Sequence, residues 1–277
     1  MNKELLAVTR LDLAEVLRSR WILFCGLVYA LLAGMFVLVG VRESNVLGFT
    51  GMGRVLMSFT HALLLLLPLL ALTATSQLVN HARDDGTLEM LFSHPLSRVR
   101  YFYAITVTRY ALLLGPLLVL VLLLGVLGSV LLRQAIPWSF LGRALAISAS
   151  LLWAFVGLGL LISTVVRNQA RAMMYVLLCF GLGAALLDFG VIGLLLKWRL
   201  HAATLFVLCA LNPVQAARMA LLSAAEPELG TLGPLGFFLA SRIGAQALFA
   251  LGTLWPAALG SLLWWRACRH FQESDLV

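Results

Sequence analysis

Six stretches of about 20 or more residues with almost no charge constrain this chain more than any other feature of its sequence. They cover residues 21–41, 55–79, 110–132, 144–166, 173–196 and 243–265. Each can cross about 30 Å of hydrocarbon as a helix rising about 1.5 Å per residue. A strand of a membrane barrel would need only about ten residues of alternating polarity. The sequence therefore predicts an all-α integral membrane protein with six transmembrane helices.

The composition supports this fold class. Hydrophobic residues make up 62% of the 277 residues and charged residues only 12%, against about 25% charged in soluble domains. Such a chain is not a soluble enzyme, a nucleic-acid-binding domain or a disordered scaffold. We assign the net charge of +8 to Lys and Arg that flank the spans. These residues are more frequent on the side of the two termini, which predicts that both termini are cytoplasmic.

Residues 1–20 precede the first span and are predicted to form an amphipathic helix in the cytoplasmic interface. An arc of about 120° gathers its apolar positions: Leu5, Leu6, Thr9, Leu13, Val16 and Leu17. The rest of the helix surface carries Lys3, Glu4, Arg10, Asp12, Glu15 and Arg18. The helix serves either as an anchor or as a contact surface for a cytoplasmic partner. Residues 21–277 form one transmembrane domain.

The longest cytoplasmic loop covers residues 80–109. Asp85 or Thr87 is predicted to cap a short helix, which Pro95 ends about two turns later. One apolar face of this helix consists of Leu88, Leu91 and Phe92. That face either docks into a groove on another protein or folds back on the bundle of its own chain.

The largest segment on the opposite side covers residues 197–242. Its Pro and Gly residues predict short helices and turns without an independent core. The apolar stretch 204–211 is too short to cross the membrane and is predicted to be a re-entrant or interfacial helix.

The chain carries no motif for its own energy source. A P-loop needs a lysine after glycine, and neither Lys3 nor Lys197 fits that pattern. The four cysteines are not spaced for a zinc site or a disulfide framework, so no cofactor or metal is expected. Asp188 and His61 are the ionisable residues well inside spans, and they are candidates for a translocation path. An ATP-independent channel or carrier would need both residues to face water, whereas a membrane scaffold would need neither.

The N-terminal helix and the cytoplasmic loop resemble the ABC-2 permease family of ABC exporters. The matching residues are Thr9-Arg10-Leu11-Asp12-Leu13, Arg18-Ser19-Arg20-Trp21, Gly86-Thr87-Leu88-Glu89, Leu91, Ser93, Pro95 and Ser97-Arg98. The chain departs from the family at Ala82, where a glutamate is usual.

The resemblance implies a six-span permease in the bacterial inner membrane that pairs with a second copy of itself. It also implies a separate cytosolic ABC ATPase, which binds ATP and Mg²⁺. The loop helix would then be the coupling helix that docks on this ATPase. Its coupling residues would be Gly86, Thr87, Leu88, Glu89, Leu91, Phe92, Pro95, Leu96 and Arg98.

Within the family, three short segments resemble the permeases of the nitrous-oxide-reductase maturation system. They are Leu47-Gly48-Phe49-Thr50, Pro68-Leu69-Leu70-Ala71-Leu72, and Asn212-Pro213 with Arg218. This resemblance implies a periplasmic accessory protein, contacted at Asn212, Pro213 and Arg218, and a role in assembling a copper centre of the reductase. The permease would act by exporting a substrate or by transmitting motion to the accessory protein. An ABC-2 exporter of another substrate is the alternative.

Overall fold

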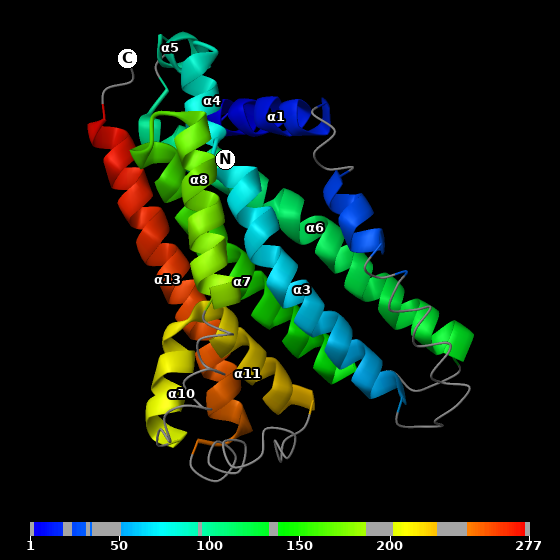
Figure 1. The fold of residues 1–277 in the computed structure, drawn as a ribbon. Helices are drawn as coiled ribbons and strands as arrows, with labels where there is room; N and C mark the ends of the chain where they lie inside the picture. Colours follow the sequence, from blue (N-terminus) through cyan, green and yellow to red (C-terminus); the bar gives the residue numbers. More distant parts are fainter. Residues whose placement is uncertain are drawn as a thin grey trace.

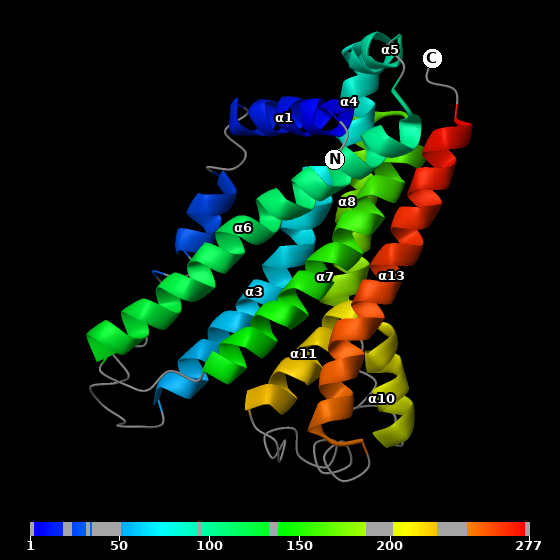
Figure 2. The ribbon, with the colours of Figure 1, turned by 180° about the vertical axis from the view of Figure 1, so that it is seen from behind.

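The computed structural model describes residues 3–18, 24–31, 34, 51–93, 96–132, 138–186, 202–225 and 243–274, which are helical apart from short turns and connections. Its named helices are α1 (Lys3–Arg18), α3 (Gly51–Thr75), α4 (Leu78–Asp84), α5 (Thr87–Phe92), α6 (Arg98–Leu132), α7 (Trp138–Val165), α8 (Gln169–Phe180), η2 (Gly181–Leu186), α10 (Ala202–Leu211), α11 (Pro213–Ala225) and α13 (Ala245–Glu273). The all-α prediction is confirmed for these residues. Figures 1 and 2 show a bundle of long helices, with α1 lying across it near the end that carries α5.

Four described helical segments are long and apolar enough to cross a membrane: Ala62–Asp84, Arg98–Leu123, Trp138–Val165 and Ala245–Glu273. They correspond to the predicted second, third, fourth and sixth spans. Of the predicted first span, residues 24–31 and 34 are described as helical. The predicted fifth span is described as far as residue 186, through α8 and the π-helix η2. The chain is therefore a multi-pass membrane protein, and the count of six spans stays a prediction.

Helix α7 forms the centre of the bundle and packs against α3, α6, α11 and α13. Glycines allow two of these neighbours to approach its backbone. A Cβ atom added at Gly157 would lie 2.5 Å from the carbonyl oxygen of Gly260 on α13. A Cβ atom added at Gly159 would overlap Thr75 Oγ1 at the end of α3. Only glycine fits where helix backbones meet this closely.

Two helices extend beyond the predicted spans at the same end of the bundle. Helix α6 begins at Arg98 rather than at residue 110, and α13 ends at Glu273 rather than at residue 265. The predicted loop 80–109 is consequently mostly helical. The physical reason is aromatic packing, since Phe102 and Phe271 stack with ring centroids 5.4 Å apart. These rings continue the core past the uncharged stretches on which the predicted boundaries rested.

Helix α1 confirms the predicted N-terminal helix, but its buried face differs from the predicted one. Val8 and Asp12 are buried against the bundle, whereas Leu13 is 37% exposed. The sequence pattern placed Asp12 on the solvent side and Leu13 on the apolar side. Asp12 can be buried because its carboxylate meets Arg109 of α6, with Oδ1 2.7 Å from Nη2. An opposite charge offsets the cost of removing a carboxylate from water.

The end of the bundle opposite α5 holds α10 and α11 (Figure 1). Both fall within the segment predicted to form short helices, and α10 confirms the short apolar helix near residues 204–211. Helix α11 is packed into the bundle, because its small residues Ala216, Ala217 and Ala220 are fully buried. Ala216 and Ala220 meet Gly252 of α13, where an added Cβ atom would lie 2.7 Å from the Ala216 carbonyl oxygen.

Candidate functional site: the α4–α5 hairpin

Two short helices, α4 and α5, form a hairpin over residues 78–93, which we call the α4–α5 hairpin. It follows α3 after a turn at Ser76 and Gln77. The backbone N–H of Val79 donates to Ser163 Oγ of α7 at 2.8 Å, and this bond is buried. The hairpin therefore starts from a fixed point on the central helix.

The chain reverses direction at Gly86, which has a φ of +67°. Glycine adopts this left-handed conformation readily, whereas other residues do so at a cost. Gly86 occupies the N-cap position of α5, and no side chain caps the helix. The prediction that Asp85 or Thr87 provides the cap is therefore wrong. The left-handed turn at Gly86 positions the first turn of α5 instead, with Met90 N–H donating to the Gly86 carbonyl at 3.2 Å.

The apolar face of α5 packs on its own bundle, which was the second of the two alternatives considered from the sequence. Leu88 is fully buried, and Leu91 and Phe92 pack against the core. The Phe92 ring lies 5.6 Å from Tyr101 of α6 and 6.3 Å from Phe271 of α13, measured between centroids. This face is not available for docking on another protein. The opposite face exposes Glu89 and Met90, and the latter is 66% exposed.

The exit from the hairpin is joined to the end of α13. Arg98 Nη1 donates to the carbonyl oxygens of Gln272 at 2.8 Å and Ser274 at 3.1 Å. The last carbonyls of a helix lack partners within the helix, and a guanidinium near them is favoured by the helix dipole. Leu96 is half-buried against the core, and Pro95 lies outside the described residues. The hairpin is thus fastened to α6, α7 and α13 at three places.

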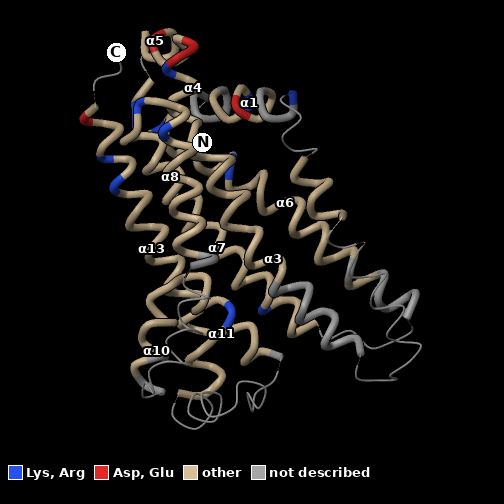
Figure 3. The backbone as a smooth tube through the Cα atoms, in the orientation of Figure 1, with Lys and Arg blue, Asp and Glu red and all other residues tan. Residues whose placement is uncertain are grey.

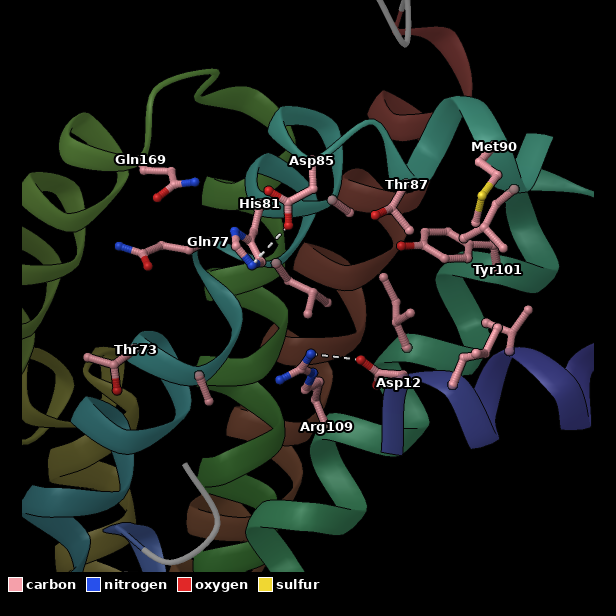
Figure 4. Close-up of a pocket in the computed structure, with 17 residues that line it drawn as sticks. Asp12, Thr73, Gln77, His81, Asp85, Thr87, Met90, Tyr101, Arg109 and Gln169 are labelled. Carbon is pink, nitrogen blue, oxygen red and sulfur yellow. Dashed lines mark hydrogen bonds and ion pairs between the residues drawn. The ribbon is translucent and has the colours of Figure 1, made fainter. Parts of the chain in front are cut away.

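A cavity of about 620 Å³ lies between the hairpin, α1, α6 and the end of α3. Figure 4 shows Asp12 and Arg109 on one side of this cavity, and His81 and Asp85 on the hairpin. The Nε2 atom of His81 lies 3.2 Å from Asp85 Oδ2, and both side chains are more than half exposed. Sequence reasoning missed the pairing of Asp12 with Arg109, because 97 residues separate them and no local pattern connects them.

The exposed part of the hairpin is acidic. Asp84, Asp85 and Glu89 are all exposed, and Figure 3 shows acidic residues at α5. Asp84 Oδ2 accepts a hydrogen bond from Gln169 Nε2 at 2.9 Å. The exposed surface of the hairpin around the Met90 side chain therefore carries acidic residues.

Five sequence-predicted residues, the pathway and periplasmic-contact candidates, lie outside the hairpin segment, and three of them are described with their side chains. Asp188 and the side chain of His61 lie outside the described residues. Asn212 is only 5% exposed, and its Nδ2 donates to the Gly183 carbonyl at 2.6 Å. Its Oδ1 accepts from Val214 N–H at 3.0 Å, which caps α11. Asn212 thus has a structural role within the chain, while Pro213 and Arg218 are half-buried.

The part of the chain that the structure describes contains no candidate metal-binding site. Within it, no group of three or more His, Cys, Asp or Glu side chains is placed to hold a metal ion. The four cysteines are free, and three of them are buried.

Known proteins similar to this chain are membrane transport proteins. A family profile described as ABC-2 family transporter protein matches residues 6–227. The chain is 27% identical over 263 residues to a protein of Stutzerimonas stutzeri named probable ABC transporter permease protein NosY, with 91% of each chain covered. The protein of that name from Pseudomonas aeruginosa is also 27% identical over 263 residues, covering 91% of this chain and 93% of its own.

Proposed function

Because the chain belongs to the ABC-2 family of transporter proteins, we propose that the exposed face of its α4–α5 hairpin binds the transporter's cytosolic ATPase. The chain is similar to permease subunits of ABC transporters, a class that works with an ATPase partner. ATP and Mg²⁺ are held by that partner in this proposal. The permease supplies the surface through which ATP-driven motion enters the membrane.

The observation that carries the proposal is the division of the hairpin into two faces. Leu88, Leu91 and Phe92 fasten it to the bundle, while Glu89 and Met90 are exposed beyond the bundle end. A partner that binds Glu89 and Met90 would act on the bundle through the contacts of Phe92 with α6 and α13. The exposed residues and the packed residues belong to the same short helix.

The predicted coupling residues thus have two different roles in this proposal. Glu89 and Met90 contact the ATPase, and Met90 joins the predicted set because it is exposed. Gly86 sets the turn, and Arg98 holds the exit of the hairpin to α13. Thr87, Leu88, Leu91, Phe92, Pro95 and Leu96 complete the hairpin and its attachment.

The orientation in the membrane follows from this assignment. The hairpin and the end of α13 lie at the same end of the bundle, and α1 lies near them (Figure 1). If the ATPase is cytosolic, this end and both termini face the cytoplasm of the bacterial inner membrane. The end with α10 and α11 then faces the periplasm. A second copy of the chain completes the transporter.

We further propose that the transporter serves maturation of the copper centre of nitrous oxide reductase, together with a periplasmic accessory protein. The likeness to the two NosY permeases over 91% of the chain supports this role. The accessory protein would bind near α10 and α11, where Pro213 and Arg218 are half-buried. Because α11 packs on α13 and α7, motion from the hairpin has a continuous packed route to this end.

The test is co-purification of the tagged permease from its native host, followed by mass spectrometry and an ATPase assay. The wild-type chain is expected to bring down an ABC ATPase and a periplasmic protein. Glu89→Lys is expected to reduce ATPase recovery at least about tenfold, because it reverses a charge in the contact. Glu273→Lys is the matched control, since it makes the same change at an exposed site at the end of α13.

Three results would change the proposal. Recovery of the ATPase without a periplasmic protein would leave an ABC-2 exporter of another substrate. Normal ATPase recovery with Glu89→Lys would place the contact elsewhere on the chain. Failure of the wild type to recover any ATPase would favour a channel or carrier, and labelling of cysteines at Asp188 and His61 would then test for a water-filled path.

A further inference from the structure

One face of α4 is polar although it is buried against the bundle. Ser76, Asn80 and Arg83 lie at positions i, i+4 and i+7, so they share one side of the helix and the turn before it. Ser76 and Asn80 are fully buried. In the part of the chain that the structure describes, no hydrogen-bond partner is found for Ser76 Oγ, for either amide atom of Asn80, or for Nε and Nη1 of Arg83.

This face meets the last turns of α7. Val79 bonds to Ser163 of α7, and α7 is the helix outside the hairpin that α4 mainly contacts. Asn80 is the next residue along α4 and is fully buried. We call the contact between α4 and α7 the α4–α7 seam.

The closed seam carries an electrostatic penalty. A buried amide, a buried hydroxyl and part of a guanidinium have lost their hydrogen bonds to water without a replacement. Val79–Ser163 is the hydrogen bond recorded across the seam. Separation of α4 from α7 would let water reach each of these groups, so opening recovers free energy that an apolar seam would lose.

We propose that the α4–α7 seam is a joint that opens and closes when a partner moves the α4–α5 hairpin, and that Asn80 keeps the closed joint from becoming a permanent contact. The proposal rests on the assignment of the hairpin as the ATPase-binding site. Partner binding selects one of two arrangements that lie close in free energy. Asn80 and Ser76 act as positioning residues, because neither side chain is exposed to a partner.

The experiment compares Asn80→Leu with wild type in lipid nanodiscs. Hydrogen exchange of peptides covering residues 78–84 reports how often the seam opens. Leucine has the same number and branching of side-chain heavy atoms and no polar atoms, so the closed seam is stabilised and exchange at Val79 is expected to slow about tenfold. Gln77→Leu is the control, because it also replaces an amide by leucine but at a half-buried residue that lines the cavity. The control is expected to exchange as the wild type does.

The second readout uses the complex of the full-length permease with its ATPase. Asn80→Leu is expected to recover the ATPase normally while losing at least about five-fold of the permease-dependent stimulation of ATP hydrolysis. Ser76→Ala removes one buried hydroxyl without adding bulk, and it is expected to shift both readouts in the same direction by a smaller factor. It carries the same test if Asn80→Leu fails to fold.

Two results would overturn the proposal that the α4–α7 seam is a joint. Exchange at Val79 that is unchanged or faster in both variants would show that the seam carries no penalty when closed. Slower exchange together with full stimulation of the ATPase would show that the seam stays shut during the cycle. Failure of the assigned docking site gives a different result, since the wild type would then lack a bound ATPase while the exchange measured on the permease alone would still respond.

Discussion

The α4–α7 seam and the contacts of α7 with α13 and α11 are held together by different interactions. At the seam, polar groups are buried without partners and a single backbone-to-hydroxyl bond is recorded. Further along α7, glycines bring helix backbones into contact, as at Gly157 and Gly260. Hydrogen bonds reinforce that region, including Ser150 to the Thr253 carbonyl and Trp153 Nε1 to Ser261 Oγ at 3.1 Å.

The comparison teaches how such a bundle can transmit motion. Close-packed helices resist deformation, because side chains that interdigitate have few alternative arrangements. A weakly held joint next to a rigid block concentrates movement in the joint. The hairpin would therefore move at the α4–α7 seam, and α7, α13 and α11 would respond as one body. In this comparison the expected site of movement follows from how the helices are packed and not from the length of a loop.

The largest effect is expected where backbone meets backbone. Gly157→Leu forces α7 away from α13, because even a Cβ atom would lie 2.5 Å from the Gly260 carbonyl oxygen. We expect a loss of about 3 kcal/mol or more in stability, from overpacking that no rotamer relieves. Thermal unfolding and size-exclusion chromatography in detergent measure it. Gly115→Leu on α6 is the control, since an added Cβ atom meets nothing within 4 Å there. If the two variants were equally stable, the close packing of α7, α11 and α13 would not make this region more rigid than the seam.

A smaller effect is expected at the buried ion pair of Asp12 and Arg109. This pair tests whether α1 unfolds together with the close-packed helices or separately from them. Asp12→Ala leaves the Arg109 guanidinium, 11% exposed, without its carboxylate. We expect a loss of about 2 kcal/mol, below the range for fully buried pairs because this pair borders a cavity. Hydrogen exchange should rise in residues 3–18 while the unfolding midpoint of the bundle stays, and Arg10→Ala, on an exposed position of α1, should change neither.

The double variant Asp12→Leu with Arg109→Leu sharpens this test. Replacing both charges with apolar residues removes the penalty of a single unpaired charge. Protection of α1 should return to near the wild-type level. A fall in the midpoint of the whole bundle with Asp12→Ala would instead show that α1 is part of the rigid block.

The pattern of uncharged residues was enough to predict four membrane-length helices in the described part of the fold. The ends of helices α3, α6, α7 and α13 were predicted within a few residues, apart from the start of α6 and the end of α13. The boundaries at Arg98 and Glu273 were missed, because the apolar run stops while aromatic contacts such as Phe102 with Phe271 continue. Hydropathy indicates which part of a helix is apolar enough to be surrounded by lipid. It does not indicate how far the helix continues through contacts with other helices.

The sequence predicted a short helix at the candidate site but did not decide what its apolar face contacts. The motif around Gly86 located the hairpin, and the spacing of Leu88, Leu91 and Phe92 gave the correct apolar face. Periodicity cannot say whether an apolar face meets another protein or its own chain, since burial is the same in both cases. The partners that settle it, Tyr101 and Phe271, are distant in sequence. The same holds for Asp12 with Arg109, and for Ser163 beneath Val79.

The smallest effect should come from the bond that closes the seam. Ser163→Ala removes the acceptor for Val79 N–H and leaves that buried donor unsatisfied, at a cost of about 1 kcal/mol. Exchange in residues 78–84 should rise about fivefold, opposite in sign to the effect of Asn80→Leu. Ser148→Ala is the matched control on the same helix, because Ser148 Oγ is buried without a partner among the described residues. Its loss should leave exchange at the seam unchanged. If both serine variants shift the unfolding midpoint equally and neither changes exchange at Val79, the seam opens only when α7, α11 and α13 unfold. In that case the hairpin does not move separately from these helices.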